Sequence, residues 1–324
     1  MFISNRLRLL RTLFHVAFLF YLVIIGIVAD EELQADDTCD QRKYGYFCKF
    51  RQTCGNSNQG SQNLDETTSG YILSGDNVEL GEFPSLAQLH VNYKGHCSAV
   101  IVSDYHLLTA SHCVFRGGAL DPVVPEDIRI VVGQVKSFLY HEKDFSKEYY
   151  NQIQVAKVCA HPSGNDVVIL TLKTPLTFDE YVQPACWPFE SDKIITKGRA
   201  SNCYQVGAGY RVRKGSSVRP LEVVQKLRVQ EHENANNDNS RAFISLRNGT
   251  GPGAICRGDS GGPTLCPESN TGRWTVIGVA SRGMLCTHDD PWYLSARLDS
   301  ELARLTLDEC APGLGKLDVS QPFD

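Results

Sequence analysis

The sequence predicts an all-β fold that ends in a single α-helix. Downstream of residue 72, short apolar runs are separated by Gly, Pro, Asn or Asp, a spacing typical of sandwiches and barrels rather than of alternating strands and helices. The clearest runs cover residues 99–102, 128–132 and 167–170. The helical pattern covers residues 299–309, where charged residues accompany Leu302, Leu305 and Leu307.

The composition is that of a soluble globular protein, with 324 residues of which 42% are hydrophobic and 21% are charged. A net charge of −5 and scattered basic residues argue against a nucleic-acid-binding protein. The 12 cysteines include no paired CxxC motif and no Cys/His cluster. We therefore expect disulfides formed in an oxidising compartment, and neither a metal site nor a cofactor.

Residues 1–29 have the charge pattern of a secretory signal peptide. Three arginines, Arg6, Arg8 and Arg11, precede an uncharged, mostly apolar run over residues 12–29, and acidic residues follow directly. We expect cleavage after Ala29 and a secreted, extracellular protein. The alternative is an uncleaved membrane anchor, because the run approaches the length that spans a bilayer.

Residues 30–71 are expected to form a loop-like pro-segment. They are polar, contain little that could form a core, and include Cys39, Cys48 and Cys54, which would pin the segment by disulfides. A folded domain of residues 72–310 follows, and residues 311–324 form a C-terminal tail.

Three segments carry the residue types of nucleophilic catalysis. His112 ends an apolar strand, Asp166 begins one, and Ser260 lies among glycines in residues 256–263. A serine hydroxyl becomes an effective nucleophile when an imidazole accepts its proton and a carboxylate orients that imidazole. Each segment alone also fits a surface histidine, a turn or a tight loop. Together they predict a Ser-His-Asp triad.

In this chain order the three segments resemble the chymotrypsin/trypsin family of serine proteases. The family patterns TAxHC and GDSGGP occur as residues 109–113 and 258–263. The resemblance, over residues 72–310, implies two antiparallel β-barrels of the chymotrypsin type with a C-terminal α-helix and an active site between the barrels. It implies the following roles: general base His112, orienting carboxylate Asp166, nucleophile Ser260, and oxyanion-hole amides of Gly258 and Ser260.

The resemblance also implies a set of disulfides. It pairs Cys97 with Cys113, Cys203 with Cys266 and Cys256 with Cys286, and it places Cys186 where relatives tether a pro-segment. For the other cysteines we favour Cys159 with Cys310, and Cys186 with one of Cys39, Cys48 and Cys54, the remaining two pairing with each other. One family disulfide is missing, because residues 243–245 stand where a cysteine usually lies.

Zymogen activation is expected at the bond between Tyr71 and Ile72. In the family, cleavage before a sequence such as residues 72–75 frees an α-amino group, which pairs with the aspartate before the nucleophile, here Asp259. Most family zymogens carry Arg or Lys at the position of Tyr71. A trypsin-like activator would therefore cut this bond poorly.

The expected specificity pocket departs from the family pattern. Ala254 stands where trypsin-like members have Asp, residues 281–283 read Ser-Arg-Gly instead of Ser-Trp-Gly, and Trp292 replaces a glycine. The predicted lining residues are Ala254, Ser281, Gly283 and Trp292. We expect this pocket to prefer small or medium apolar residues and to reject Arg and Lys, which would be buried without a carboxylate partner.

Two alternatives for the pocket stay open. A local insertion would turn Trp292 and Tyr293 outward, and Asp289 or Asp290 would supply a carboxylate from the side. Elsewhere, Asn248-Gly249-Thr250 is an N-glycosylation sequon, which suits a secreted protein.

These features predict a secreted serine endopeptidase that works through an acyl-enzyme and is made as a zymogen. Its partners would be protein or peptide substrates, an activating protease and a protein inhibitor. The alternative is a non-catalytic, protease-like regulatory or binding protein, which Tyr71 and the altered pocket keep open.

Overall fold

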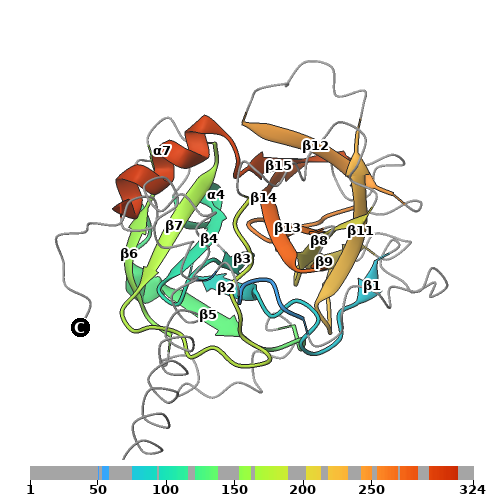
Figure 1. The fold of residues 1–324 in the computed structure, drawn as a ribbon, viewed down its shortest axis with the longest axis horizontal. Coiled ribbons are helices and arrows are strands. Elements are labelled where there is room, and N and C mark those ends of the chain that lie inside the picture. The colour runs from blue at the N-terminus through green and yellow to red at the C-terminus, as the bar shows by residue number, and fades with distance from the viewer. Residues whose placement is uncertain are drawn as a thin grey trace, which may run out of the picture. The chain divides into compact units, whose positions relative to one another are not determined.

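A computed structural model of the chain describes residues 50, 53–57, 75–92, 95–115, 121–137, 153–161, 165–188, 202–212, 218–232, 242–249, 254–268, 271–283 and 292–312. In these residues the chain forms two large antiparallel sheets, a short two-stranded sheet and a C-terminal helix (Figure 1). The predicted all-β class with two barrels and a final helix is confirmed.

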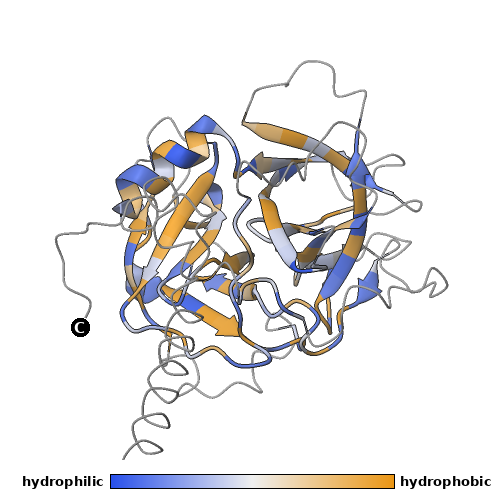
Figure 2. Ribbon diagram, in the orientation of Figure 1, coloured by the Kyte–Doolittle hydropathy of each residue, from blue (hydrophilic) through white to orange (hydrophobic). Residues whose placement is uncertain are grey.

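The first large sheet has six strands in the order β5-β2-β3-β4-β7-β6 and forms an open half-barrel. Its strands are β2 (Leu86–Val91), β3 (Gly95–Ile101), β4 (His106–Ala110), β5 (Ile128–Val132), β6 (Val155–Cys159) and β7 (Val167–Leu172). Hydrophobic residues colour β5 and β7 along most of their length (Figure 2). Leu89, Leu107 and Leu170 are fully buried in the core of this sheet.

The second large sheet closes into a barrel, because β8 pairs with both β13 and β11. Its strands are β8 (Cys203–Gly207), β11 (Gln225–Glu231), β12 (Phe243–Asn248), β13 (Pro263–Pro267), β14 (Trp274–Gly283) and β15 (Trp292–Arg297). Burial alternates along β11 and β12, so that Leu227, Val229 and Leu246 point into the barrel.

Shorter elements complete the fold. β1 (Asp76–Asn77) pairs with β11, and β9 (Tyr210–Val212) pairs with β10 (Val218–Pro220). The helical elements are α4 (Ser111–Val114), η2 (Pro125–Asp127) and α7 (Glu301–Cys310).

The C-terminal helix α7 (Glu301–Cys310) begins and ends close to the predicted range of residues 299–309, but of the three leucines in the predicted pattern only Leu307 is buried. Ser300 caps its N-terminus by accepting a hydrogen bond from the amide of Ala303. The buried residues are Ala303, Thr306, Leu307 and Cys310, which recur at three and four residues, whereas Leu305 is 37% exposed. α7 packs against β7, a strand whose Val168 and Leu170 are buried in the core of the first sheet.

Four disulfides join described cysteines. They are Cys97–Cys113, Cys203–Cys266, Cys159–Cys310 and Cys54–Cys186. The first three pairs are those favoured from the sequence, and Cys54 is the pro-segment cysteine that reaches Cys186. Cys256 is also disulfide-bonded. Its expected partner Cys286, together with Cys39 and Cys48, lies outside the described residues.

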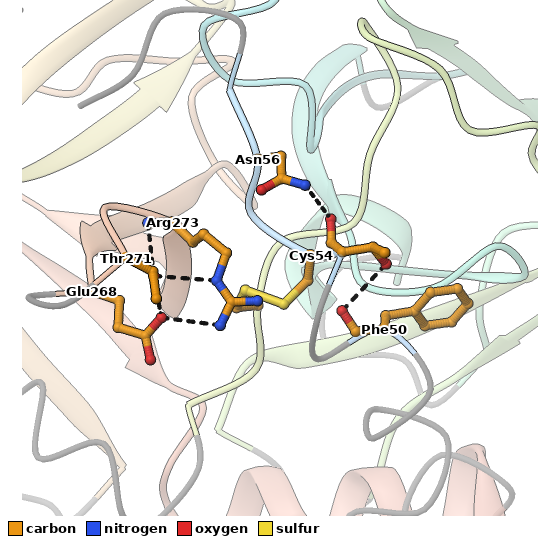
Figure 3. A network of polar contacts seen from close by, with 8 residues as sticks. Phe50, Cys54, Asn56, Glu268, Thr271 and Arg273 are labelled. Carbon is orange, nitrogen blue, oxygen red and sulfur yellow. Dashed lines mark hydrogen bonds and ion pairs between the residues drawn. A yellow bond between two sulfur atoms is a disulfide. The ribbon is translucent and has the colours of Figure 1, made fainter. Parts of the chain in front are cut away.

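The described residues 50 and 53–57 lie in the predicted pro-segment, and Phe50 and Cys54 share a small hydrophobic cluster with Phe178 and Cys186. Phe50 is 8% exposed and packs edge-on against Phe178, beside the Cys54–Cys186 disulfide. Figure 3 shows Phe50, Cys54 and Asn56 near Arg273, whose guanidinium binds Glu268. Gly55 donates to the carbonyl of Pro184 and accepts from the amide of Trp274, at 2.8 Å each. These residues therefore pack against the region of Phe178 and Cys186, and a pro-segment over residues 30–71 stays a prediction.

Candidate active site

His112 and Asp166 are joined by two hydrogen bonds, and a third joins the neighbouring Ser111 to Asp166. The α4 turn directly follows β4, and its residue His112 presents Nδ1 2.8 Å from Oδ2 of Asp166. The His112 amide donates to Asp166 Oδ1 at 3.0 Å, and the Ser111 amide donates to the Asp166 carbonyl at 3.0 Å. The histidine side chain is 47% exposed and the carboxylate 20% exposed. The aspartate is therefore placed to fix the orientation of an accessible imidazole.

Asp166 has an unusual backbone and a low pKa. Its φ of 63° lies in the left-handed region, which among the described non-glycine residues occurs here alone and which Asp tolerates better than most side chains. Burial by itself would raise the pKa of Asp166. The hydrogen bonds and charge of His112, with a hydrogen bond from Ser281, outweigh burial and lower that pKa below its ordinary value.

Ser281 has a role that the sequence did not reveal. It was assigned to the specificity pocket, but its hydroxyl donates to Asp166 Oδ2 at 2.5 Å across 115 residues of sequence. Oδ2 of Asp166 is therefore the partner of both the Ser281 hydroxyl and His112 Nδ1. The one sequence feature that could have indicated this role is the Ser-x-Gly pattern of residues 281–283, which the family shares.

Ser260 lies in a tight turn packed against the strand that leads to His112. The Ser260 carbonyl accepts from the amide of Ser98 at 2.8 Å. Gly261 follows with φ +78°, and a Cβ there would lie 2.0 Å from Thr109 Oγ1 and 2.3 Å from the Ser98 carbonyl. Because only glycine permits this approach, the GDSGG motif brings the Ser260 turn against the end of β4.

Ser98, a fully buried residue of β3, also contacts this turn through its side chain. Its hydroxyl donates to the Gly258 carbonyl at 3.2 Å and accepts from the Ala208 amide at 3.4 Å. Thr109 in turn donates to the Ser98 carbonyl at 2.7 Å. No local pattern indicated this serine, because its partner Gly258 lies 160 residues away.

The amides of Gly258 and Ser260 are available as donors. Among the described residues, neither amide donates a hydrogen bond to another protein group. Gly258 adopts φ +90°, and its carbonyl is held by Ser98. Two free N–H groups in one short turn suit the stabilisation of a developing oxyanion.

Asp259 is buried beneath this turn. Its carboxylate accepts from the amides of Gly209 at 2.9 Å and Cys256 at 2.8 Å, and among the described residues no cation contacts it. Burial raises the pKa of Asp259 to about 6, although the two amides act in the opposite direction. This aspartate is therefore a buried acid that a nearby cation would stabilise in its charged form.

The predicted pocket residues are placed in different environments. Ala254 is half-buried before the turn, and Gly283 pairs with Tyr293. Tyr293 points into the barrel core, where its hydroxyl donates to Gln205 at 3.2 Å, whereas the ring of Trp292 stacks on His232 at 6.1 Å. The alternative in which an insertion turns the rings of both Trp292 and Tyr293 outward is thus wrong for Tyr293. Whether the Trp292 ring narrows the specificity pocket stays a prediction.

The predicted glycosylation site Asn248 is the last residue of β12. Its side-chain nitrogen, to which a glycan would be attached, is buried, and the residue is 7% exposed. Glycosylation of Asn248 stays a prediction. Tyr71, Ile72, Asp289, Asp290 and the signal region lie outside the described residues.

Comparison with known proteins identifies the family. The sequence model of the Trypsin family matches residues 72–299. Together with the double-barrel fold, this match shows that the chain belongs to the chymotrypsin/trypsin family of serine proteases.

Individual relatives match the same region. The proclotting enzyme of Tachypleus tridentatus is 28% identical over 238 residues, or 69% of this chain. Mouse transmembrane protease serine 11C is 26% identical over 66% of the chain, and rat transmembrane protease serine 9 is 30% identical over 68%. The matches cover 62%, 48% and 20% of these relatives. Among the described residues, no helix combines the length and hydrophobicity needed to cross a membrane.

Proposed function

We propose that this protein is a secreted serine endopeptidase made as a zymogen. The observation that carries the proposal is that the segments of His112 and Asp166 lie together and that the turn of Ser260 packs against β4, the strand before His112. His112 is oriented by Asp166, and the turn containing Ser260 packs on the strand that ends at His112. Membership of the family supplies the reaction class, which is hydrolysis of peptide bonds in proteins.

In the proposed reaction Ser260 Oγ attacks the carbonyl carbon of the scissile peptide bond. His112 accepts the hydroxyl proton at Nε2, while Nδ1–H donates to Asp166, which stabilises the imidazolium. The carbonyl oxygen becomes an oxyanion that accepts from the amides of Gly258 and Ser260. His112 then gives the proton to the leaving amine. Water attacks the acyl-enzyme by the same route and regenerates Ser260.

The zymogen part of the proposal rests on Asp259. Ionisation of a buried carboxyl with a raised pKa is unfavourable until a cation approaches it. An α-amino group freed at Ile72 would be that cation. Its pairing with Asp259 would order the turn that carries both oxyanion donors, so the uncut chain should be nearly inactive.

The alternative is a non-catalytic regulator with a protease fold. One observation favours it: both carboxylate oxygens of Asp259 already accept backbone hydrogen bonds, so the turn is held without cleavage. Under this alternative, Tyr71–Ile72 stays intact and partners bind the uncut chain.

Substitution of the triad tests the enzymatic proposal. In the activated protein, Ser260→Ala or His112→Ala should lower kcat by several orders of magnitude without loss of the fold. Because the triad acts as a unit, the double variant should be scarcely worse than either single variant. The measurement is hydrolysis of a peptide library, with circular dichroism as the control for folding. Peptidase activity of purified Ser260→Ala equal to wild type would exclude the proposal.

A further inference from the structure

A group of polar side chains is buried inside the second barrel and reaches the turn of Ser260. Its members are Gln205 of β8, Thr264 of β13 and Tyr293 of β15, all of which are buried. Thr264 and Gln205 are register partners in neighbouring strands, so their side chains lie side by side. A buried polar side chain is costly unless it is hydrogen-bonded, which makes the partners of this group informative.

Gln205 uses every hydrogen-bonding position of its amide. Nε2 donates to the Gly262 carbonyl at 2.9 Å and to the Val206 carbonyl at 3.2 Å. Oε1 accepts from the Thr264 hydroxyl at 2.8 Å and from the Tyr293 hydroxyl at 3.2 Å. Because backbone carbonyls can only accept, Nε2 must face them, and the two hydroxyls must donate to Oε1. The orientation of the Gln205 amide is therefore fixed.

The Gly262 carbonyl that Gln205 holds belongs to the turn of the nucleophile. The Gly262 amide donates to the Asp259 carbonyl at 3.0 Å, which closes the turn of residues 259–262 around Ser260. The Ala280 amide donates to the same Gly262 carbonyl at 2.9 Å. Two donors, one from a side chain and one from the backbone, thus fix the end of this turn.

The segment that carries Gln205 also holds the start of the turn. From Gln205 the chain continues to Gly209, whose amide donates to Asp259 Oδ1 at 2.9 Å. A Cβ at Gly207 would lie 2.3 Å from the same oxygen, so the end of β8 is in close contact with the Asp259 carboxylate. One short segment therefore contacts both the first and the last residue of the turn that carries Ser260.

We propose that Gln205 is a positioning residue for Ser260, and that the hydroxyls of Thr264 and Tyr293 orient its amide. This proposal rests on the proposed function and adds residues of the barrel core to it. Gln205 acts through the Gly262 carbonyl: while that carbonyl is held, the Ser260 hydroxyl and the oxyanion amides keep the geometry that the transition state requires. Loss of the Gln205 amide should therefore lower kcat more than it changes KM.

The first variant replaces Gln205 by methionine, which is similar in size and has no amide. In the activated protein, Gln205→Met should lower kcat about ten-fold and change KM less than about two-fold, the loss expected for one or two hydrogen bonds. The measurement is steady-state hydrolysis of the peptide that the wild type cleaves best, well below the melting temperature of the variant.

Gln88→Met is the matched control. Gln88 is a buried glutamine of β2 in the other large sheet, and its Nε2 donates to the Lys136 carbonyl at 2.8 Å. The same substitution there should lower the melting temperature without changing kcat or KM. Comparison of the two variants thus separates the effect on the Ser260 turn from a general loss of stability.

Two further variants test the orientation of the amide. Thr264→Val and Tyr293→Phe each remove one hydroxyl that donates to Gln205 and keep the approximate shape of the side chain. Each should lower kcat about two- to three-fold, less than Gln205→Met does, because the amide is then held less firmly. Combined with Gln205→Met, neither should lower kcat further, since the amide that they orient is absent.

Wild-type kcat in folded Gln205→Met, an equal loss of kcat in Gln88→Met, or additive losses in the double variants would overturn the proposal. If Gln205→Met does not fold, wild-type kcat in both Thr264→Val and Tyr293→Phe would overturn it. Failure of the activated wild-type protein to cleave any peptide would overturn the proposed function, and this proposal with it.

Discussion

At the scale of single residues, Asp259 couples the charge of the active-site turn to pH. Its folded pKa of about 6 lies above the ordinary value near 3.9. A raised carboxyl pKa means that the fold favours the neutral form, so the stabilising contribution is present below about pH 4 and is lost as pH rises to about 6. Such a difference corresponds to about 3 kcal/mol of unfolding free energy.

The uncut protein should therefore lose stability between about pH 4 and pH 6.5 more steeply than Asp259→Asn. Thermal unfolding over this range measures the effect, with Ser260→Ala in both proteins to prevent self-cleavage. Parallel stability curves for the two proteins would show that Asp259 does not titrate in this range.

Ser98 offers a second test at this scale. Ser98→Ala removes the hydroxyl that donates to the Gly258 carbonyl, so the oxyanion amides should be less well oriented. We expect kcat to fall about five-fold, the equivalent of one hydrogen bond of about 1 kcal/mol, with KM nearly unchanged.

The matched control is Ser103→Ala, another fully buried serine, whose hydroxyl contacts His106 Nδ1 at 2.9 Å and the Tyr105 amide. It should lower stability without changing kcat. A fall in kcat of equal size in both variants would mean that Ser98 acts only through general stability.

At the scale of elements, the turn of residues 256–262 depends on close packing against β3 and β4. Gly261→Ala combines a left-handed φ with a Cβ 2.0 Å from Thr109 Oγ1, so both the turn and the strand must shift. We expect loss of nearly all peptidase activity and a lower melting temperature. Gly95→Ala is the control, because it has φ +100° but nothing within 4 Å of its Cβ. It should cost only the backbone strain of about 1–3 kcal/mol. Comparable activity of the two variants would contradict the packing argument.

The elements also show which features were predictable from sequence. His112, Asp166 and Ser260 could be predicted as site residues because each has its own local context of strand end or glycine turn. The spacing of apolar residues predicted the α7 helix but not the set of residues that it buries. Thr306 and Cys310 are buried because α7 packs against β7 and because Cys310 forms a disulfide with Cys159. Ser98 and Ser281 act across 160 and 115 residues, a relation that no local pattern contains.

At the scale of the whole molecule, the Cys54–Cys186 disulfide ties the predicted pro-segment to the domain that matches the protease family. It closes a loop with a sequence separation of 132 residues, and the chain-entropy model gives about 5 kcal/mol for such a loop. Packing of Phe50 on Phe178 adds to this attachment.

After cleavage between Tyr71 and Ile72, the pro-segment should remain attached on a non-reducing gel and separate on reduction. The Cys54→Ser/Cys186→Ser variant should release it without reduction, which provides the control. Release of the segment from the wild-type protein under non-reducing conditions would refute the tether.

The most direct test of the central claim, a working Ser-His-Asp triad, is covalent labelling of the processed protein with a serine-directed fluorophosphonate, followed by peptide mass mapping. We expect a label on Ser260 that is abolished in Ser260→Ala and nearly abolished in His112→Ala, because the hydroxyl is then not activated. Processed wild-type protein in which Ser260 stays unlabelled would contradict the claim and favour the non-catalytic regulator.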